Sequence, residues 1–571
     1  MAGGYENEGG GKKKTIAIAS VASLVLVAMV VAVAVGQNNI QNGSKASSGG
    51  GGGEIHASVK AVKAFCQPTD YKEACEHSLS KAAGNTTDPK ELVKLAFEVT
   101  VTKAKQVLKN STVLKEAQKD PMTKKALANC EELMGYSIDD LKTSLGQIGT
   151  FDLTTLDEVV DDVKMWLSAS VTYQETCLDG FEGVNSEVGE KMRKLMKGVA
   201  QLTSNVLAIV TEISTVISEL DLQSLLHRRR LLESSSVPDW VSDTGRRLLS
   251  TASFHPDVVV AKDGSGNFKT INDAVNTVPL KSKKPFIIYV KEGVYKEQVV
   301  IDKTMWNVVL IGDGPEKTRI TGNLNFIDGT PTFKTATVAA IGDGFMAKNI
   351  GFENSAGPEK HQAVALRVQS EKSVFYNCRM DAYQDTLYFH TKRQFYRDCT
   401  ISGTVDFMFG NAAVVFQNCV LLVRKPLDNQ QNIITAQGRK DKREPTALII
   451  QNATIVAEPD YVPFAKKLPT YLGRPWKEYS RTFFMQSDLG DFVHPDGWLP
   501  WEGDFALKTC FYAEYENRGP AAAQSERVKW RGIKTLSPER AKLFTVEKFI
   551  GGHHWIPRSG VPFTPSLYKS V

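Results

Sequence analysis

Several familiar catalytic arrangements are missing from this sequence. It has no Gly-x-Ser-x-Gly segment, which excludes the strained serine turn of the α/β-hydrolases. His361 and His390 have no nucleophile-like neighbour, so we expect them to be structural or to lie at the edge of a substrate site. The turn-like segment 263–267 lacks the remaining spacing of a calcium loop and the lysine of a phosphate loop. No metal and no organic cofactor is indicated.

The charge balance is nearly even overall, but the two parts of the chain differ. Residues 251–571 hold 41 Lys and Arg against 33 Asp and Glu, whereas residues 1–250 hold 28 against 31. The C-terminal part is therefore +8 and the N-terminal part −3, within a total of +5. A basic surface favours a polyanionic partner, and ordinary scatter in surface charge is the alternative. A length of 571 residues allows two to four domains, of which we expect two.

Residues 1–36 contain a stretch without charge. Thr15 to Val35 runs for 21 residues with no charged side chain, directly after three lysines at 12–14. An apolar helix of this length crosses a hydrocarbon core, and the lysines place the N-terminus in the cytoplasm. We expect a signal segment or a type II anchor that sends the rest of the chain into the secretory pathway. Nucleic acid is not an expected partner behind such a segment.

A flexible linker and four possible glycan sites fit this secretory route. Residues 37–54 are rich in Asn, Ser and Gly and predict a tether without secondary structure. The Asn-x-Ser/Thr triplets predict glycosylation of surface asparagines if they are used. They begin at Asn42, Asn85, Asn110 and Asn452.

Residues 55–226 have a helical pattern. Apolar positions recur at three- and four-residue steps in 91–108 and again in 186–225. Long helices joined by short polar turns predict an up-and-down bundle. Cys66 with Cys75 could join an N-terminal hairpin, and Cys130 with Cys177 could join two helices. In an oxidising compartment we expect two disulfides, and buried free thiols are the alternative.

A serine-rich linker at 227–252 carries two basic clusters. These are Arg-Arg-Arg-Leu-Leu from Arg228 and Arg-Arg-Leu-Leu from Arg246. Exposed multibasic sites in a linker suit a processing protease of the secretory pathway, whereas a solvated charge run is the structural alternative. Cleavage would release a mature part that begins near Leu248 to Ser253 and contains the domain at 253–571.

A cysteine-bearing phrase repeats three times in the C-terminal part. Its cysteines, Cys378, Cys399 and Cys419, are 21 and then 20 residues apart. Short aromatic and β-branched runs with this period predict the rungs of a β-solenoid, because each rung buries its apolar face only by stacking on a neighbour. If the cysteines stack, a disulfide could join Cys399 to Cys378 or to Cys419.

Polar residues follow the same period. Gln362, Gln384, Asp385 and Asp406 lie at steps of 22 and 21 residues. In a parallel β-helix, where rungs lie about 4.8 Å apart, these side chains should form a ladder of two amides and two carboxylates. Two stacked carboxylates cost stability, and they often have pKa values that are pushed apart for catalysis.

Five ordered segments over about 300 residues resemble the motif set of plant pectin methylesterases. They are Gly-Val-Tyr-Lys-Glu at 293–297, Gln-Ala-Val-Ala-Leu-Arg at 362–367, Tyr-Gln-Asp-Thr-Leu at 383–387, Asp-Phe-Met-Phe-Gly at 406–410 and Leu-Gly-Arg-Pro-Trp at 472–476. Met408 stands where many family members have Ile, which is a volume-conserving change. The resemblance implies a right-handed parallel β-helix that removes methyl esters from pectin in the cell wall.

The resemblance also implies roles for particular residues. Asp406 would be the nucleophile and Asp385 the proton donor and later the base, while Gln362 and Gln384 would stabilise the oxyanion. A cation beside Asp406 would keep it charged, and Arg474 is the candidate. The residues expected to contact substrate are Thr332, Gln362, Arg474 and Trp476, of which the tryptophan would stack on a sugar ring or, as the alternative, pack within the protein. Weaker candidates for lining the groove are Phe409, Tyr388 and Trp498.

The same likeness extends to the other cysteines and to the bundle. Among the possible pairs it favours Cys399 with Cys419. Residues 55–226 resemble the invertase and pectin methylesterase inhibitor family, a four-helix bundle, and Asp179-Gly180-Phe181 adds to that likeness. The bundle would be a pro-region that inhibits, aids folding or retains the precursor. Proteinaceous inhibitors are accordingly expected among the partners.

Alternatives from two classes of protein remain open from the sequence. A β-helix lyase would need a calcium carboxylate cluster, and an inverting polygalacturonase would need carboxyl groups about 6.5 to 9.5 Å apart. A wall protein that binds pectin without activity is the alternative from another class. Methanol release from methylated pectin would distinguish the esterase from both.

Overall fold

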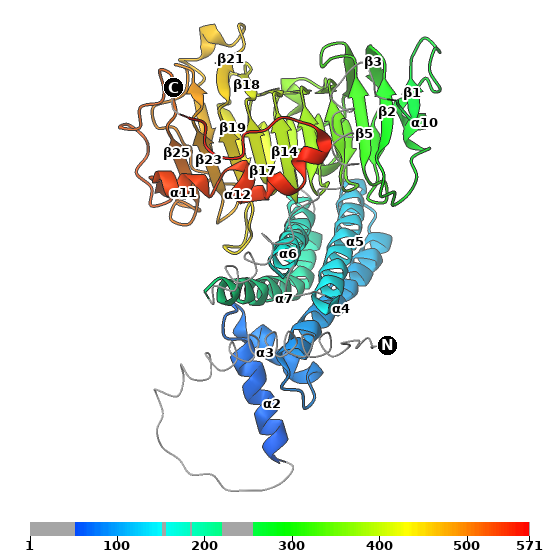
Figure 1. The fold of residues 1–571 in the computed structure, drawn as a ribbon, viewed down its shortest axis with the longest axis vertical. Helices are drawn as coiled ribbons and strands as arrows, with labels where there is room; N and C mark the ends of the chain where they lie inside the picture. Colours follow the sequence, from blue (N-terminus) through cyan, green and yellow to red (C-terminus); the bar gives the residue numbers. More distant parts are fainter. Residues whose placement is uncertain (1–51, 151–155, 183–185, 220–254, 570–571) are drawn as a thin grey trace, which may run out of the picture. The chain divides into compact units, whose positions relative to one another are not determined.

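The computed structural model describes residues 52–150, 156–182, 186–219 and 255–569, which fall into two compact units. Each unit has its own contacts and is described separately (Figure 1). The charge-free segment at 15–35, the linker with Asn42 and both arginine clusters lie outside the described residues. Within the described part of the chain, no helix is both long and apolar enough to cross a membrane.

The first unit is helical, as predicted. Its described helices are α2 (Gly52–Phe65), α3 (Lys72–Ala82), α4 (Pro89–Ala117), α5 (Pro121–Thr150), α6 (Leu156–Asp179) and α7 (Ser186–Glu219). α4 packs on α5 and α7, and α6 packs on the same two helices, which gives the expected four-helix bundle. The start of α4 is set by Asp88, whose carboxylate accepts a hydrogen bond from the amide of Lys90 at 2.9 Å.

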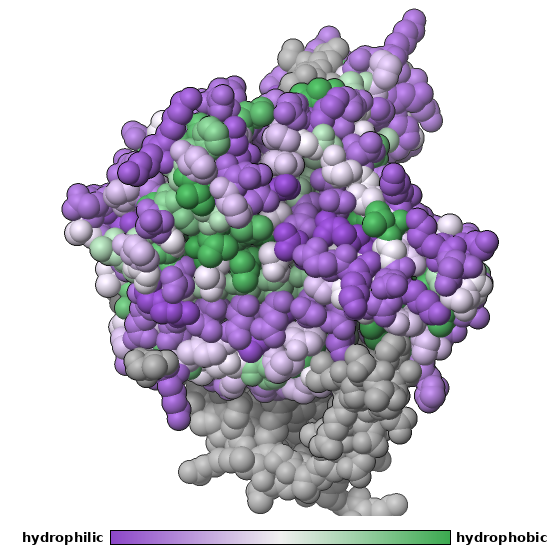
Figure 2. All heavy atoms as spheres, turned by 90° about the horizontal axis from the view of Figure 1, so that it is seen from above, coloured by the Kyte–Doolittle hydropathy of each residue, from purple (hydrophilic) through white to green (hydrophobic). Residues whose placement is uncertain are grey.

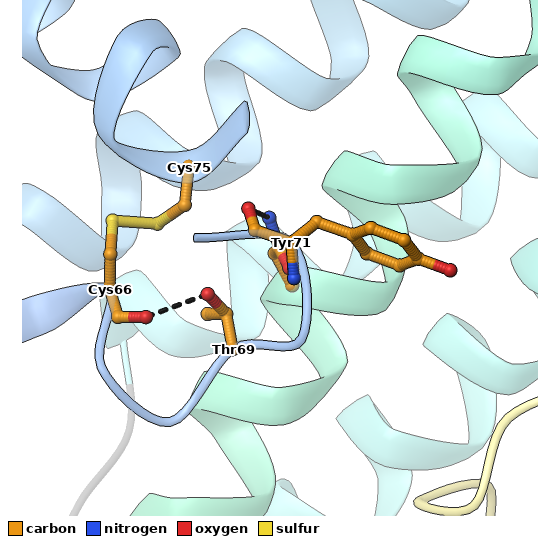
Figure 3. Close-up of a disulfide and its surroundings, with 5 residues drawn as sticks. Cys66, Thr69, Tyr71 and Cys75 are labelled. Atoms are coloured by element: carbon orange, nitrogen blue, oxygen red, sulfur yellow. Dashed lines mark hydrogen bonds between the residues drawn. A yellow bond between two sulfur atoms is a disulfide. The ribbon is translucent and has the colours of Figure 1, made fainter. Parts of the chain in front are cut away.

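Both predicted disulfides of the bundle are present. Cys66–Cys75 connects the end of α2 to α3, with a Cα–Cα distance of 5.8 Å, and Cys130–Cys177 connects α5 to α6. Figure 3 shows the first bridge, where the Thr69 hydroxyl donates to the carbonyl of Cys66 at 2.7 Å. The hairpin turn is also fixed to α7, because the Asn205 side chain exchanges two hydrogen bonds with the backbone of Tyr71, at 3.1 and 2.9 Å.

The second unit is a parallel β-helix of three sheets, and it confirms the predicted solenoid. The eleven-stranded sheet holds β1 (Val258–Val260), β2 (Phe286–Val290), β5 (Val308–Gly312), β8 (Met346–Lys348), β11 (Ser373–Tyr376), β14 (Arg393–Arg397), β17 (Ala413–Gln417), β20 (Ala447–Gln451), β23 (Arg481–Met485), β25 (Phe511–Tyr515) and β26 (Ile533–Lys534). The seven-stranded sheet holds β4 (Val299–Ile301), β7 (Val338–Ala340), β10 (Leu366–Val368), β13 (Leu387–Phe389), β16 (Met408–Gly410), β19 (Asn432–Gln437) and β22 (Thr470–Gly473). The eight-stranded sheet holds β3 (Gly293–Lys296), β6 (Thr318–Gly322), β9 (Gly351–Asn354), β12 (Arg379–Asp381), β15 (Thr400–Gly403), β18 (Val420–Val423), β21 (Thr454–Ala457) and β24 (Asp488–Leu489). The short helices α10 (Ile271–Val275), α11 (Pro538–Lys542) and α12 (Val546–Ile550) accompany the sheets.

The repeated phrase explains how the coil turns. Asn377, Asp398 and Asn418 each precede a repeat cysteine and have φ values of 48°, 51° and 57°. Asn and Asp tolerate this left-handed region better than most residues, so they suit the corner between the eleven-stranded and eight-stranded sheets. One strand of the period-two pattern also shows the alternation directly, since Val299 and Ile301 are buried while Val300 is 51% exposed.

Aromatic rings stack along the interior in register. Phe375, Tyr396 and Phe416 are aligned on β11, β14 and β17, with ring centroids 4.6 and 4.4 Å apart. In contrast, the surface in Figure 2 is mainly hydrophilic: its largest group of apolar side chains lies left of the centre of the view, and smaller groups are scattered elsewhere. The apolar periodicity therefore fills a continuous core inside the coil.

The predicted Cys399–Cys419 disulfide is wrong. Cys378, Cys399 and Cys419 are buried free thiols, and Cys510 is a fourth. The sulfur of Cys399 contacts the carbonyl of Arg397 at 3.3 Å, and that of Cys419 contacts the carbonyl of Tyr396 at 3.8 Å. In-register side chains of neighbouring rungs are parallel and about 4.8 Å apart, whereas a disulfide needs Cβ atoms about 3.8 Å apart.

The C-terminal segment lies across the eleven-stranded sheet, drawn in red in Figure 1. Three outward-facing glutamines bind the backbone of every second residue of this segment: Gln417 binds Thr564, Gln451 binds Ser566 and Gln486 binds Tyr568. The segment thus crosses successive rungs and covers the sheet at β17, β20 and the end of β23.

Candidate active site

The two aspartates of the predicted ladder lie on adjacent rungs of the seven-stranded sheet. Asp385 and Asp406 stand two residues before β13 and β16, whose register pairs Leu387 with Met408. The amide of Asp385 donates to the carbonyl of Val405 at 3.1 Å, which extends the same alignment to the aspartates. Their exposed fractions are only 8% and 6%.

Both aspartates have a left-handed backbone. The φ angles are 65° at Asp385 and 49° at Asp406. Non-glycine residues in this region store strain, and such residues cluster at active sites. Aspartate is one of the residue types that adopt this conformation most readily, so the chain turns sharply here while it presents a carboxylate.

Arg474 holds Asp406 with two hydrogen bonds. It follows β22, and its Nε and a terminal nitrogen donate to the two carboxylate oxygens at 2.9 and 2.5 Å. The indole of Trp501 stacks over the guanidinium at 4.3 Å. The sequence reasoning missed Trp501, because it lies 27 residues from Arg474 and no repeat connects the two. Arg474, covered by Trp501, gives Asp406 a fixed orientation and a compensating positive charge.

Burial raises the pKa of both aspartates, but not equally. The pKa of Asp385 is raised well above 3.8, first by burial and then by the negative charge of Asp406. The pKa of Asp406 is also raised by burial, and the Arg474 guanidinium opposes that shift. Of the two carboxyl groups, Asp385 is therefore the one that keeps a proton and Asp406 the one that ionises first.

The two glutamines are aligned beside the aspartates. The amide of Ala363 donates to the carbonyl of Gln384 at 3.2 Å, which sets Gln362 against Gln384. The carbonyl of Thr386 accepts from two successive amides, those of residues 365 and 366, at 2.9 and 3.4 Å. This one-residue bulge accounts for the step of 22 in a repeat of 21. Both side chains are half-buried, and the oxygen of Gln384 is buried without a hydrogen-bond partner among the described groups.

Aromatic rings line the outer face of the sheet beside the aspartates. Tyr388 and Phe409 are stacked with centroids 4.2 Å apart, and Trp476 meets Phe409 edge-on at 6.0 Å. Trp476 is half-buried. Trp498 does not line this surface: it is 1% exposed and stacks on Tyr512 inside the coil, so its assignment to the groove is wrong.

The remaining predicted positions differ in their surroundings. His390 is fully buried, with its ring 4.6 Å from Tyr388, and burial lowers its pKa well below 6.5, so it is a neutral packing residue. Thr332 begins the short turn Thr332–Lys334, which is tied to the strand after Gln362 because the Thr335 hydroxyl accepts from the amide of Val364 at 3.0 Å. Among the described residues no group of three or more His, Cys, Asp or Glu side chains is arranged to hold a metal.

The comparisons with known proteins agree with this geometry. Residues 257–553 match the pectinesterase family model, and a protein of Arabidopsis thaliana named probable pectinesterase/pectinesterase inhibitor 21 is 51% identical over 99% of this chain and 84% of its own length. This chain belongs to the pectinesterase family. Pectinesterase 3 of Phaseolus vulgaris is 46% identical over 89% of this chain and 87% of its own length.

Two further matches cover the separate units. Residues 60–209 of this pectinesterase match the plant invertase/pectin methylesterase inhibitor model. The structure of pectin methylesterase from carrot is 50% identical, with a TM-score of 0.55, and is matched over 100% of its length by 56% of this chain. That relative is therefore a folded protein of the size of the β-helix unit alone, which makes residues 253–571 a suitable fragment for experiments.

Proposed function

We propose that this pectinesterase hydrolyses the methyl esters of homogalacturonan and releases methanol, with Asp406 as nucleophile and Asp385 as general acid and base. The observation that carries the proposal is the difference between the two aspartates. Arg474 binds Asp406 and favours its ionised form, while burial and the negative charge of Asp406 keep Asp385 protonated. The names of the relatives supply the ester and its polysaccharide.

In the first half of the reaction, the carboxylate of Asp406 attacks the carbonyl carbon of the ester. The tetrahedral oxyanion accepts hydrogen bonds from the side-chain amino groups of Gln362 and Gln384, which is the stabilisation expected of preorganised donors. The bond to the methoxy oxygen breaks, and Asp385 gives its proton to that oxygen. Methanol leaves, and an acyl anhydride with Asp406 remains.

In the second half, Asp385 is an ionised base. It takes a proton from water, and the resulting hydroxide attacks the acyl carbon of the uronate. The bond to Asp406 breaks and regenerates its carboxylate, while Asp385 is protonated again. The product acid loses its proton to solvent. One water enters and one methanol leaves in each cycle.

The decisive experiment measures methanol release by the 253–571 unit. Asp406→Asn and Asp385→Asn are the suitable variants, because asparagine also tolerates φ values of 49° and 65°. We expect both to fold and to bind methylated pectin, but Asp406→Asn should release no methanol and Asp385→Asn should lose at least about a hundredfold in turnover. Wild-type release by Asp406→Asn would refute the nucleophile. Unsaturated or reducing chain ends in the wild-type sample would indicate a lyase or a polygalacturonase instead.

We also propose a route for the precursor. The segment at 15–35 targets or anchors the chain as a type II membrane protein, a protease cuts after Arg230 or Arg247, and the β-helix unit reaches the cell wall. The bundle is the pro-region. Comparing methanol release before and after cleavage tests inhibition, since equal activity would exclude it. Tracking the N-terminal segment and the β-helix separately in fractionated cells tests the route.

The described asparagines of the Asn-x-Ser/Thr triplets differ in exposure. Asn85 and Asn110 are exposed on the bundle and are suitable acceptors. Asn452 is half-buried, and its side-chain nitrogen donates to Asn418 at 2.8 Å. A glycan on that nitrogen would replace this hydrogen bond, so we favour the two bundle sites. Mass analysis of the secreted precursor after glycosidase treatment tests this.

A further inference from the structure

A buried glutamate organises the loop at 438–446, which connects β19 to β20. Glu444 is 1% exposed. One carboxyl oxygen accepts from the side chain of Asn411 at 2.8 Å, and the other accepts from the amides of Lys440 and Asp441, each at 2.8 Å. A buried carboxyl group is costly unless such bonds satisfy it, so this residue has a defined task in the loop.

Two arginines close the same loop on the end of β19. Arg439 donates to the carbonyl of Glu444 at 2.8 Å, and Arg481 donates to the carbonyl of Thr446 at 2.9 Å. The side-chain oxygen of Gln437 accepts from the amides of both arginines, at 3.1 and 2.7 Å. These hydrogen bonds hold the loop against the sheet, with the glutamate as its central acceptor.

The loop in turn holds the segment that follows β22. The carbonyl of Arg439 accepts from the amide of Tyr479 at 3.0 Å. The ammonium group of Lys440 forms an ion pair with Glu478 at 3.0 Å. These two contacts connect the turn at Glu444 to residues 478 and 479, directly after Trp476.

Trp476 rests on the backbone of the same loop. A Cβ atom at Gly438 would lie 2.8 Å from the indole of Trp476, so the glycine allows the ring to lie against the chain. On its other side the indole meets Phe409 and Tyr388 edge-on, at 6.0 and 6.5 Å. The position of this ring is thus set jointly by the sheet and by the loop.

We propose that Glu444 is a positioning residue for Trp476: it fixes the loop at 438–446, and thereby the face that the indole presents to the sugar rings of pectin. This inference rests on the proposed function and names a residue that acts on substrate binding rather than on bond breaking. Arg474 is held independently, by its own amide on the carbonyl of Thr435 at 3.0 Å and by its bonds to Asp406. Loss of the glutamate should therefore raise KM and leave kcat nearly unchanged.

The experiment compares Glu444→Ala, Glu444→Gln and Glu371→Ala in the 253–571 unit. Glu371 is a matched control, since it is also a buried glutamate, 7% exposed, and accepts from the amide of Arg393 at 3.0 Å in another turn. We expect KM for methylated pectin to rise about tenfold in Glu444→Ala, with kcat within about twofold of the wild type. Glu444→Gln keeps an oxygen for the two loop amides and should restore most of the affinity. Glu371→Ala should lower Tm without changing KM.

A double-mutant cycle with Trp476→Ala supplies the second test. If the glutamate acts through the indole, the double variant should have the KM of Trp476→Ala alone. The inference is overturned if the two effects on KM are additive, or if Glu444→Ala and Glu444→Gln both keep the wild-type KM. A wild-type unit that releases no methanol would overturn the proposed function and this inference together, whereas an active wild type with an unchanged KM in both variants overturns only the inference.

Discussion

Arg474 donates two hydrogen bonds to Asp406, while Asp385 on the neighbouring rung feels the guanidinium only through its charge. Because the two aspartates interact unequally with this one cation, their pKa values differ although their side chains are chemically identical. It gives the ionised carboxylate to the rung of β16 and the protonated carboxyl to the rung of β13. The division of labour in the proposed reaction follows from that single contact.

Arg474→Lys should therefore lower kcat/KM and shift its pH dependence. A lysine cannot form the planar pair of bonds, so kcat/KM should fall about a hundredfold. The lysine would offset the effect of burial on Asp406 less than the arginine does, so the pKa of Asp406 should rise. The acidic limb of the pH profile of kcat/KM should then move to higher pH. Arg397→Lys, at a site where the arginine contacts Gln417 and Tyr568, is the control and should keep the wild-type profile. An unmoved acidic limb in Arg474→Lys would contradict the assignment.

Asp385→Asn should stabilise the β-helix although it lowers turnover. The folded pKa of Asp385 is raised by burial and by Asp406, so its stability contribution is present below the unfolded pKa and is lost as pH rises through the folded pKa. Asparagine mimics the protonated form at every pH. We expect the Tm of the variant to equal that of the wild type at or below about pH 4, to exceed it increasingly as the pH rises toward the folded pKa of Asp385, and to keep a constant advantage above it.

Asp381→Asn is a control, because its effect on stability should change with pH in the opposite direction. Burial alone would raise the pKa of Asp381, but Arg379, Ser402 and Arg319 together lower it. Its contribution is therefore present above the unfolded pKa and is lost as pH falls through the folded one. Asp381→Asn should be less stable than the wild type at pH 7 and should approach it in acid. Parallel curves for the two variants would show that the raised pKa of Asp385 is not the cause.

The repeat period of the sequence predicted the fold and the pairing of Asp385 with Asp406, because a repeat fixes which residues of neighbouring rungs lie in register. It could not predict how the side chains of such residues are oriented. Cys399 and Cys419 lie on neighbouring rungs and yet remain thiols, since parallel side chains do not converge. Trp498 and Trp501 are three residues apart, and only the structure shows that the first is interior and the second covers Arg474.

Thiol counting tests the corrected cysteine assignment. The chain has 8 cysteines, of which four form the two bundle disulfides, so four thiols should react when the unreduced protein is denatured. In the native protein these thiols are buried and should react far more slowly. Mass analysis after alkylation measures the number added. Two additions instead of four would show that two of these cysteines form a disulfide within the β-helix.

Removal of the C-terminal segment should destabilise the β-helix without altering its chemistry. Gln417, Gln451 and Gln486 would lose their backbone partners at 564, 566 and 568. The five hydrogen bonds contribute about 0.5 to 1.5 kcal/mol each, so truncation after Gly560 should lower the free energy of unfolding by about 2.5 to 7.5 kcal/mol. Urea denaturation of the 253–571 unit measures this.

Tyr568→Phe separates the side chain of the segment from its backbone. The hydroxyl donates to Asn418 at 2.7 Å and accepts from Arg397 at 3.0 Å, so its loss should cost about 1 kcal/mol and leave the backbone contacts in place. Because Asp385 and Asp406 lie on a different sheet from these glutamines, methanol release per folded molecule should stay at the wild-type rate in both variants. A truncated protein with an unchanged urea midpoint would show that the segment rests on the sheet without stabilising it.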